Sequence, residues 1–406
     1  MNQRGISGIG IAVPRNILRL EDLARARDVV PAKFTKGLGQ ESFAVPCTNQ
    51  DSVTLAADAL DDLIRRTGID PRDIGRLVVG TETEVDHAKS IASYLMDLFP
   101  LPRTCETFEV KQACIGGTYA LNDAMDWSLL RGKVAVVINS DISRYEIGGA
   151  GEPTQGAGAV ALLVTPQPSL LTFDLPTGTC SGNENTFYRP LGSEHAIVDG
   201  KESVKHYLAG LVRCYDDFLK NEGNPEHDLF VSHLPYTAIA RKAFAVFTLA
   251  QKIREETPDA TEEGFAELVE RIFAGDLKEI IQEAKATPDF EERFQTQTAP
   301  SLTFSRSVGN IYTGSMYLGL ASLLTHLGEQ ANGQSILFYS FGSGSSAKMM
   351  RATVQNNTVD IRLPTPIPLT VLDYERVRGG GILLEDQGVV IESIEGQTGI
   401  RHYKRT

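Results

Sequence analysis

The segment ETFEVKQACIGGTYALNDAMDW, residues 106–127, places a cysteine between a predicted strand and a predicted helix. The residues TFEV are typical of a short strand that ends shortly before the cysteine. Beyond it, apolar residues recur at the spacing of one helix face, namely Leu121, Ala124, Met125 and Leu129. The segment therefore predicts a strand, a turn that contains Cys114, and a helix that begins directly after the turn.

A thiol at a helix start is chemically distinctive. Unpaired backbone N–H groups and the helix dipole favour an anion there, which predicts a lowered pKa for Cys114 and a reactive thiolate. Gly116 and Gly117 follow, and each destabilises a helix by about 1 kcal/mol relative to alanine. Two interpretations remain open: the glycines admit a substrate backbone or thioester, or they allow another element to pack closely.

The strand-then-helix pattern recurs along the chain and predicts an α/β protein with buried, mostly parallel sheets. Clear examples are GRLVVGTETEVDHAKSIASYLMDLF at 75–99 and AGAVALLVT at 157–165. The chain has 406 residues, which is too long for one ordinary core. The proline-containing segment PQPSLLT, 166–172, marks the predicted boundary between an N-terminal half, 1–168, and a C-terminal half, 169–406.

Composition excludes several classes of function. The net charge of −13 argues against a general nucleic-acid or anionic-membrane surface. No segment approaches the roughly 20 apolar residues of a membrane span, and the first residues lack the apolar core of an export signal. We therefore predict a cytoplasmic protein with reduced thiols. No two of its five cysteines have metal-ligand spacing: Cys47, Cys105, Cys114, Cys180 and Cys214.

A nucleophilic cysteine needs partners from other segments. His233 follows the predicted strand LFVS and precedes a proline, which places an imidazole at a strand end. Asn310 precedes an apolar helix, which it could cap, or it could point its amide at a ligand. Glu82 and Glu84 follow a buried strand at the predicted start of the next helix. There, a carboxylate is either a general base or an ordinary helix-terminus charge.

Taken together, these segments resemble the bacterial-type 3-hydroxy-3-methylglutaryl-CoA synthases of the thiolase superfamily. The matching segments occur in the family's order up to about residue 350: GTETEVDHAKS, FEVKQACIGGTYAL, GEPTQGAGAVAL, FYRPLGSEHAIVDG, SHLPYT, VGNIYTGSMYLGLASLL and SFGSGSSA. The resemblance implies a thiolase-like, five-layered αβαβα fold of two similar halves that forms a homodimer. It also implies an enzyme of isoprenoid biosynthesis, in the mevalonate pathway.

The resemblance further implies roles for individual residues. Cys114 would be the acyl-accepting nucleophile, Glu82 the general base and acid, and His233 the residue that polarises the acetoacetyl group. Four more positions match residues that line the pocket or lie near the thiol: Tyr145, Thr154, Asn310 and Ser343. Acetyl-CoA and acetoacetyl-CoA would be the substrates, with no metal, nucleotide or flavin cofactor. In this interpretation Gly116 and Gly117 keep bulk away from an acetyl thioester.

The sequence also departs from the family's pattern. Ala238 follows SHLPYT where a lysine is usual, so we consider Arg241 and Lys242 as its replacements for binding the anionic CoA. Residues 250–300 form a longer, acidic, predicted helical segment whose charged faces we expect to be solvated.

Three alternatives remain open at this stage. The first is a relative that condenses acyl groups held by an acyl carrier protein in polyketide β-branching. The second is a decarboxylating ketoacyl synthase, although that reaction needs no carboxylate such as Glu82 to form its carbanion. The third is a member without catalytic activity that only binds acyl-CoA or acts as a scaffold for partner proteins.

Overall fold

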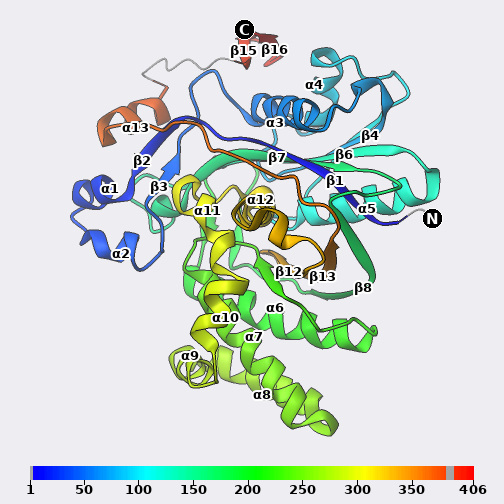
Figure 1. Ribbon diagram of the computed structural model, residues 1–406. Helices are drawn as coiled ribbons and strands as arrows, with labels where there is room; N and C mark the ends of the chain where they lie inside the picture. Colours follow the sequence, from blue (N-terminus) through cyan, green and yellow to red (C-terminus); the bar gives the residue numbers. More distant parts are fainter. Residues whose placement is uncertain (1–2, 381–387) are drawn as a thin grey trace.

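The computed structural model describes residues 3–380 and 388–406. Its centre is one nine-stranded sheet (Figure 1). In spatial order the strands are β11 (Leu229–Ser232), β12 (Ser335–Gly342), β13 (Ser346–Val354), β8 (Leu171–Ser181), β1 (Gly5–Ala12), β7 (Gly156–Val164), β6 (Val134–Ser143), β4 (Ile74–Gly80) and β5 (Glu106–Val110). Strands β1 and β8 pair over only two residues each, so the sheet divides into two sections there.

Helices fill the space between the two sections and cover both outer faces (Figure 1). The central pair is α5 (Gly116–Arg131) and α12 (Ser315–Leu327). The outer helices are α3 (Ser52–Thr67) and α4 (Ile91–Leu98) on one side, and α6 (Gly200–Lys220) and α7 (Ile239–Glu256) on the other. The predicted five-layered, thiolase-like α/β fold is confirmed.

The central layer explains the apolar pattern of residues 106–127. Leu121, Ala124 and Met125 of α5 are fully buried in one core cluster with apolar residues of α12 and both sheet sections. Burying such side chains stabilises the fold by about 1.5–3 kcal/mol for each large residue. Helix α5, which begins directly after the Cys114 turn, is thus held in place by packing against α12 and both sections of the sheet.

The prediction of mostly parallel sheets is wrong. The pairs β4–β5, β4–β6 and β11–β12 are parallel, whereas the other five pairs of the large sheet are antiparallel. The reason lies in the connections. The links from β6 to β7 and from β12 to β13 contain no crossover helix, and a chain that turns back directly must pair antiparallel.

The acidic segment forms three helices beyond α7, at the bottom of Figure 1. They are α8 (Thr261–Ala274), α9 (Leu277–Lys285) and α10 (Phe290–Gln297). Their apolar sides, including Phe265, Ile280 and Phe294, are buried in a cluster with α6 and α7. Most of their glutamates are exposed, which confirms the prediction of amphipathic helices with solvated charged faces.

Smaller elements surround the N-terminal section and the cavity. They are β2 (Asn16–Arg19), α1 (Leu20–Ala26), α2 (Pro31–Thr35), β3 (Ser42–Ala44), β9 (Phe187–Tyr188), β10 (Ile197–Val198), α11 (Thr303–Val308), β14 (Ile367–Pro368), α13 (Val371–Arg378), β15 (Val389–Ile394) and β16 (Arg401–Arg405). The segment that follows β13 returns to the N-terminal half. There, β14 pairs with β2, α13 contacts α1, and the β15–β16 hairpin packs on α3 and α4.

No helix among the described residues is long and apolar enough to cross a membrane.

Candidate active site

Cys114 lies in a tight turn between β5 and α5, as predicted. The residue before it, Ala113, has a positive φ of 45°, and α5 begins at Gly116, two residues after Cys114. The end of β12 packs directly on this turn, because a Cβ at Gly342 would lie 2.7 Å from the backbone nitrogen of Ile115. The FGSGS loop and the cysteine turn therefore form one continuous wall.

The two glycines after the cysteine serve packing, so the interpretation that they make room for an acetyl thioester is wrong. A Cβ at Gly117 would lie 1.9 Å from Oδ1 of Asn139, and one at Gly116 would lie 3.0 Å from the carbonyl oxygen of Val110. Both glycines are buried, and the neighbours of their missing side chains belong to the sheet. The glycines let α5 approach β5 and β6 closely.

Replacing Gly117 with alanine should therefore destabilise the fold. We expect a loss of about 1–3 kcal/mol in the free energy of unfolding, the usual effect of overpacking a well-filled core. Chemical denaturation measures it, with Gly200→Ala as the control, since a Cβ at Gly200 meets nothing within 4 Å. Equal stability of the two variants would contradict the packing role.

Glu82 meets Cys114 although 32 residues separate them in sequence. The thiol Sγ donates to Oε1 of Glu82 over 2.8 Å. The carboxylate comes from the loop after β4, whereas α4 begins only at Ile91. The predicted position of Glu82 and Glu84 at a helix start is thus wrong, and the helix-terminus interpretation of these charges falls away. Instead, Glu84 contacts the exposed His87 over 3.0 Å.

Burial sets the protonation of this pair. Desolvation, reinforced by Asp141, raises the pKa of Glu82 to about 8. Desolvation and the neighbouring Glu82 also raise the pKa of the Cys114 thiol well above its usual value. The predicted lowering of the thiol pKa by the helix start is therefore wrong, because burial beside a carboxyl group outweighs the helix dipole. The resting cysteine is a thiol that needs a base to remove its proton.

Asp141 is a functional candidate that the sequence analysis missed. Its Oδ1 accepts hydrogen bonds from the backbone nitrogen of Glu82 at 2.7 Å and from the hydroxyls of Thr81 and Thr83 at 3.0 and 2.9 Å. Its Oδ2 accepts from the backbone nitrogen and the hydroxyl of Thr313. Burial raises the pKa of Asp141 to about 6. This buried carboxyl group fixes the loop that presents Glu82.

One cavity of about 290 Å³ brings the other predicted residues together. Six of them line it: Cys114, Tyr145, Thr154, His233, Asn310 and Ser343. Glu82 borders a neighbouring, more polar hollow of about 800 Å³, and Ser343 lines both. The cysteine–glutamate contact thus lies between a cavity suited to an acyl chain and a hollow open to water.

His233 follows β11, at the strand end where it was predicted. Its backbone carbonyl accepts from the Tyr207 hydroxyl over 2.9 Å, and its backbone nitrogen donates to the Tyr339 carbonyl over 2.8 Å. Burial lowers the pKa of the imidazole to about 3. His233 is therefore neutral near pH 7 and can donate or accept a hydrogen bond without carrying a charge.

Asn310 serves both purposes that the sequence left open. Its Oδ1 accepts from the backbone nitrogen of Tyr312 at 2.9 Å and from the Ser315 hydroxyl at 2.8 Å, which caps the turn leading into α12. The residue also lines the cavity. Because its oxygen is occupied, its amide N–H groups are the part suited to binding a ligand.

Arg241 and Lys242 do not line the cavity that contains Cys114. The Arg241 guanidinium pairs with Glu291 and lies 4.9 Å from the ring centre of Phe294. It borders a separate hollow of about 360 Å³ that also contains Ala238. Lys242 donates to the Tyr236 hydroxyl over 3.0 Å, and Tyr236 does line the cavity. Lys242 thus reaches the cavity wall, whereas Arg241 is engaged elsewhere.

Arg189 is a second residue that sequence reasoning missed. Its guanidinium donates to the backbone carbonyl of Glu82, and it comes from the segment FYRPLGSEHAIVDG that carried part of the resemblance. That match was the one available signal. It identified the segment but not this residue.

Fold and site together define the class, that of thiolase-like acyltransferases. Family models for the N-terminal and C-terminal parts of hydroxymethylglutaryl-coenzyme A synthase match residues 1–169 and 175–368. The chain belongs to the hydroxymethylglutaryl-CoA synthase family.

Individual relatives agree with this assignment. The hydroxymethylglutaryl-CoA synthase of Enterococcus faecalis is 34% identical over 382 residues, which cover 91% of this chain and 90% of the relative. That of Mycosarcoma maydis is 34% identical over 388 residues, covering 88% and 83%. The solved structure of MvaS in complex with 3-hydroxy-3-methylglutaryl coenzyme A has a TM-score of 0.87 and 34% identity, covering 100% of this chain and 99% of the other.

Proposed function

We infer that this protein condenses acetyl-CoA with acetoacetyl-CoA to give 3-hydroxy-3-methylglutaryl-CoA and free CoA, through an acetyl group carried on Cys114. The observation that carries the proposal is the 2.8 Å contact between the Cys114 thiol and the Glu82 carboxylate at the edge of the cavity. It pairs a nucleophile with a base, and the same base is then placed beside an acyl group on the sulfur.

The first step transfers the acetyl group. Glu82 takes the thiol proton as Sγ attacks the thioester carbonyl of acetyl-CoA, and the bond between that carbonyl carbon and the CoA sulfur breaks. The proton then passes to the departing CoA thiolate, which regenerates the carboxylate. Cys114 now holds the acetyl group as a thioester, and free CoA has been formed.

The second step forms the carbon–carbon bond. Glu82 removes a proton from the acetyl methyl group, and the resulting enolate attacks the C3 ketone of acetoacetyl-CoA. The neutral His233 imidazole donates a hydrogen bond to the ketone oxygen as it gains charge. Because the pKa of His233 is about 3 and that of Glu82 about 8, protonated Glu82 supplies the proton that the new alkoxide takes up.

The last step releases the product. Water attacks the thioester on Cys114, the bond from the acyl carbon to Sγ breaks, and the thiol is restored. The polar hollow beside Glu82 provides a route for this water, since Glu82 borders it. In this scheme the protein side chains, the two CoA thioesters and one water molecule supply the reacting groups.

This function and the carrier-protein alternative differ in the acetoacetyl substrate that the enzyme accepts, which is a CoA thioester in the first and a carrier-protein thioester in the second. We would supply acetyl-CoA to the protein and offer acetoacetyl-CoA and acetoacetyl-carrier protein in parallel, measuring the condensed product by mass spectrometry. We expect turnover with acetoacetyl-CoA. Turnover with the carrier form alone would refute the proposed substrate while leaving the chemistry of the site intact.

The rate of condensation should rise with pH. Glu82 acts as a base only when ionised, and its pKa is raised to about 8. We therefore expect kcat/KM to increase with pH and to level off above about 8, because a raised pKa keeps the carboxyl protonated at lower pH. A steady-state profile from about pH 6 to 10 checks this, and a profile that is flat or falls across this range would contradict it.

A further inference from the structure

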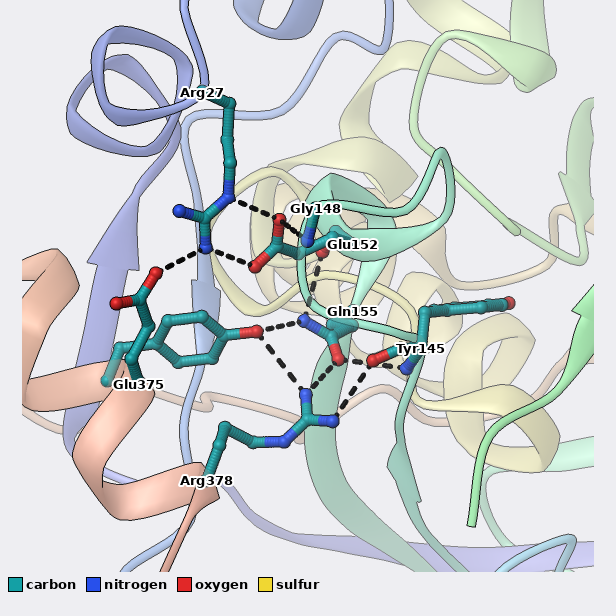
Figure 2. Close-up of polar contacts among 8 residues, drawn as sticks. Arg27, Tyr145, Gly148, Glu152, Gln155, Glu375 and Arg378 are labelled. Carbon is teal, nitrogen blue, oxygen red and sulfur yellow. Dashed lines mark hydrogen bonds and ion pairs between the residues drawn. The ribbon is translucent and has the colours of Figure 1, made fainter. Parts of the chain in front are cut away.

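Helix α13, Val371–Arg378, lies beyond residues 175–368, which the C-terminal family model matches. It nevertheless lies against the loop between β6 and β7, residues 144–155 (Figure 2). That loop supplies Tyr145 and Thr154 to the cavity. Through a 3.2 Å hydrogen bond from the Asn310 backbone nitrogen to the Thr154 carbonyl oxygen, it also supports Asn310.

The loop has little conformational preference of its own. Its sequence RYEIGGAGEPTQ contains three glycines within four positions, 148–151. Glycine gives the backbone a wide choice of conformations, and fixing one residue costs about 1–2 kcal/mol in entropy. A loop of this composition needs contacts from outside to hold its side chains in one place.

Gln155 is the centre of those contacts (Figure 2). This residue is 2% exposed. Its Oε1 accepts from the backbone nitrogen of Tyr145 over 3.0 Å, and its Nε2 donates to the Tyr374 hydroxyl over 2.8 Å. One side chain thus joins the cavity residue Tyr145 to helix α13.

Arg378 closes this arrangement from the last turn of α13 (Figure 2). Its Nη2 donates to the backbone carbonyl of Tyr145 over 3.0 Å, and its Nη1 donates to Oε1 of Gln155. Both backbone polar groups of Tyr145 are therefore held, its nitrogen by Gln155 and its oxygen by Arg378. A planar guanidinium is suited to binding two acceptors in fixed directions.

In addition to these hydrogen bonds, an ion-pair bridge through Arg27 joins α13 to the same loop (Figure 2). Arg27 donates to both carboxylate oxygens of Glu152 at 2.9 Å and pairs with Glu375 of α13 at 2.7 Å. Glu152 is 1% exposed and also accepts from the Gly148 backbone nitrogen over 2.9 Å. The Arg27–Glu152 arm is bidentate and its carboxylate is buried, so it is stronger than an exposed ion pair.

Apolar packing anchors the helix that makes these contacts. Tyr374 is 1% exposed and is buried in a cluster with Leu18 and Phe43, and its ring meets that of Phe43 edge to face at 5.5 Å. Leu38, another residue on the cavity wall, packs against the same cluster. This apolar packing fixes helix α13 to the N-terminal half, and the polar side chains of the helix contact the loop.

We propose that α13 is a positioning element for the acyl cavity, and that Arg378 is the positioning residue that fixes Tyr145 beside Cys114. This inference rests on the proposed function where it concerns catalysis. Arg378 touches no reacting atom. It acts through the backbone of Tyr145 and through Gln155.

The test compares Arg378→Met with Arg376→Met. Arg376 is exposed on the same helix, so the pair separates the contacts of Arg378 from a mere change of charge. With acetyl-CoA and acetoacetyl-CoA, we expect Arg378→Met to lower kcat by about 10–100-fold, the usual effect of a small misplacement of groups that line the reacting site. KM should change much less, and Arg376→Met should behave as the wild type. Arg378→Lys, which keeps one of the two contacts, should recover part of the loss.

Amide hydrogen exchange of residues 144–155 gives a readout that does not depend on activity. We expect faster exchange there in Arg378→Met than in the wild type or Arg376→Met, with the thermal midpoint of unfolding nearly unchanged. If the two variants share the same kcat and the same exchange, the proposal is overturned. If the wild type fails to condense either acceptor, the proposed function is refuted, while the exchange rates still decide whether α13 holds the loop.

Discussion

Replacing Glu82 with alanine is expected to stop carbon–carbon bond formation while acetylation of Cys114 continues. The loss in condensation should be about 10²–10⁴-fold, the range typical of a general base. Without the carboxylate nothing removes a proton from the acetyl methyl group, so no enolate forms. Acetylation should be slower but should survive, because acetyl-CoA is an activated thioester and because removing the Glu82 carboxyl also removes one cause of the raised pKa of the Cys114 thiol. The thiol can then lose its proton to water.

The matched control is Glu84→Ala. Glu84 belongs to the same loop, but its carboxylate contacts the exposed His87, whereas that of Glu82 contacts Cys114, so removal of Glu84 should leave condensation nearly unchanged. Radiolabelled acetyl-CoA measures the acetyl-enzyme, and product formation from acetoacetyl-CoA measures condensation. Normal condensation by Glu82→Ala would remove Glu82 from its role. If Glu82→Ala lost acetylation and condensation to the same extent, Glu82 would act only by removing the proton of the Cys114 thiol.

Replacing Cys114 with serine should eliminate the acetyl-enzyme and lower condensation by more than about 10³-fold, as expected for loss of a nucleophile. A serine hydroxyl is far less acidic than a thiol, and Glu82, with a pKa of about 8, is too weak a base to compensate. The measurements are acetyl incorporation and the rate of product formation.

Cys180→Ser is the control for thiol chemistry in general, since Cys180 is a free, partly exposed cysteine that does not line the cavity. It should acetylate and condense like the wild type. Substantial condensation by Cys114→Ser would show that the reaction does not pass through this residue.

Much of the fold could be predicted because strand and helix periodicities are local. The segment around Cys114 gave a strand, a turn and a helix with the correct buried face. Strand direction could not be predicted in the same way, because it depends on whether a connection crosses the sheet or turns back. The contacts of β14, α13 and the β15–β16 hairpin with the N-terminal half are likewise tertiary contacts that no local pattern reveals.

The features of the site likewise divide into those that the sequence could predict and those that it could not. Cys114, His233 and Asn310 stand at the ends of elements, where side chains from distant segments converge, so their positions could be anticipated. The pKa of the thiol could not, because desolvation by the surrounding protein is invisible in the sequence. Asp141 was missed because it lies inside the apolar strand β6, and Arg378 because its target is 233 residues away in sequence.

The most direct test of the mechanism is to locate the acetyl group itself. The protein is mixed with labelled acetyl-CoA without an acceptor, quenched in acid, digested and sequenced by mass spectrometry. We expect one labelled acetyl group on Cys114, which disappears when acetoacetyl-CoA is added before the quench. Condensation that proceeds while Cys114 stays unlabelled, or with the label on another residue, would contradict it.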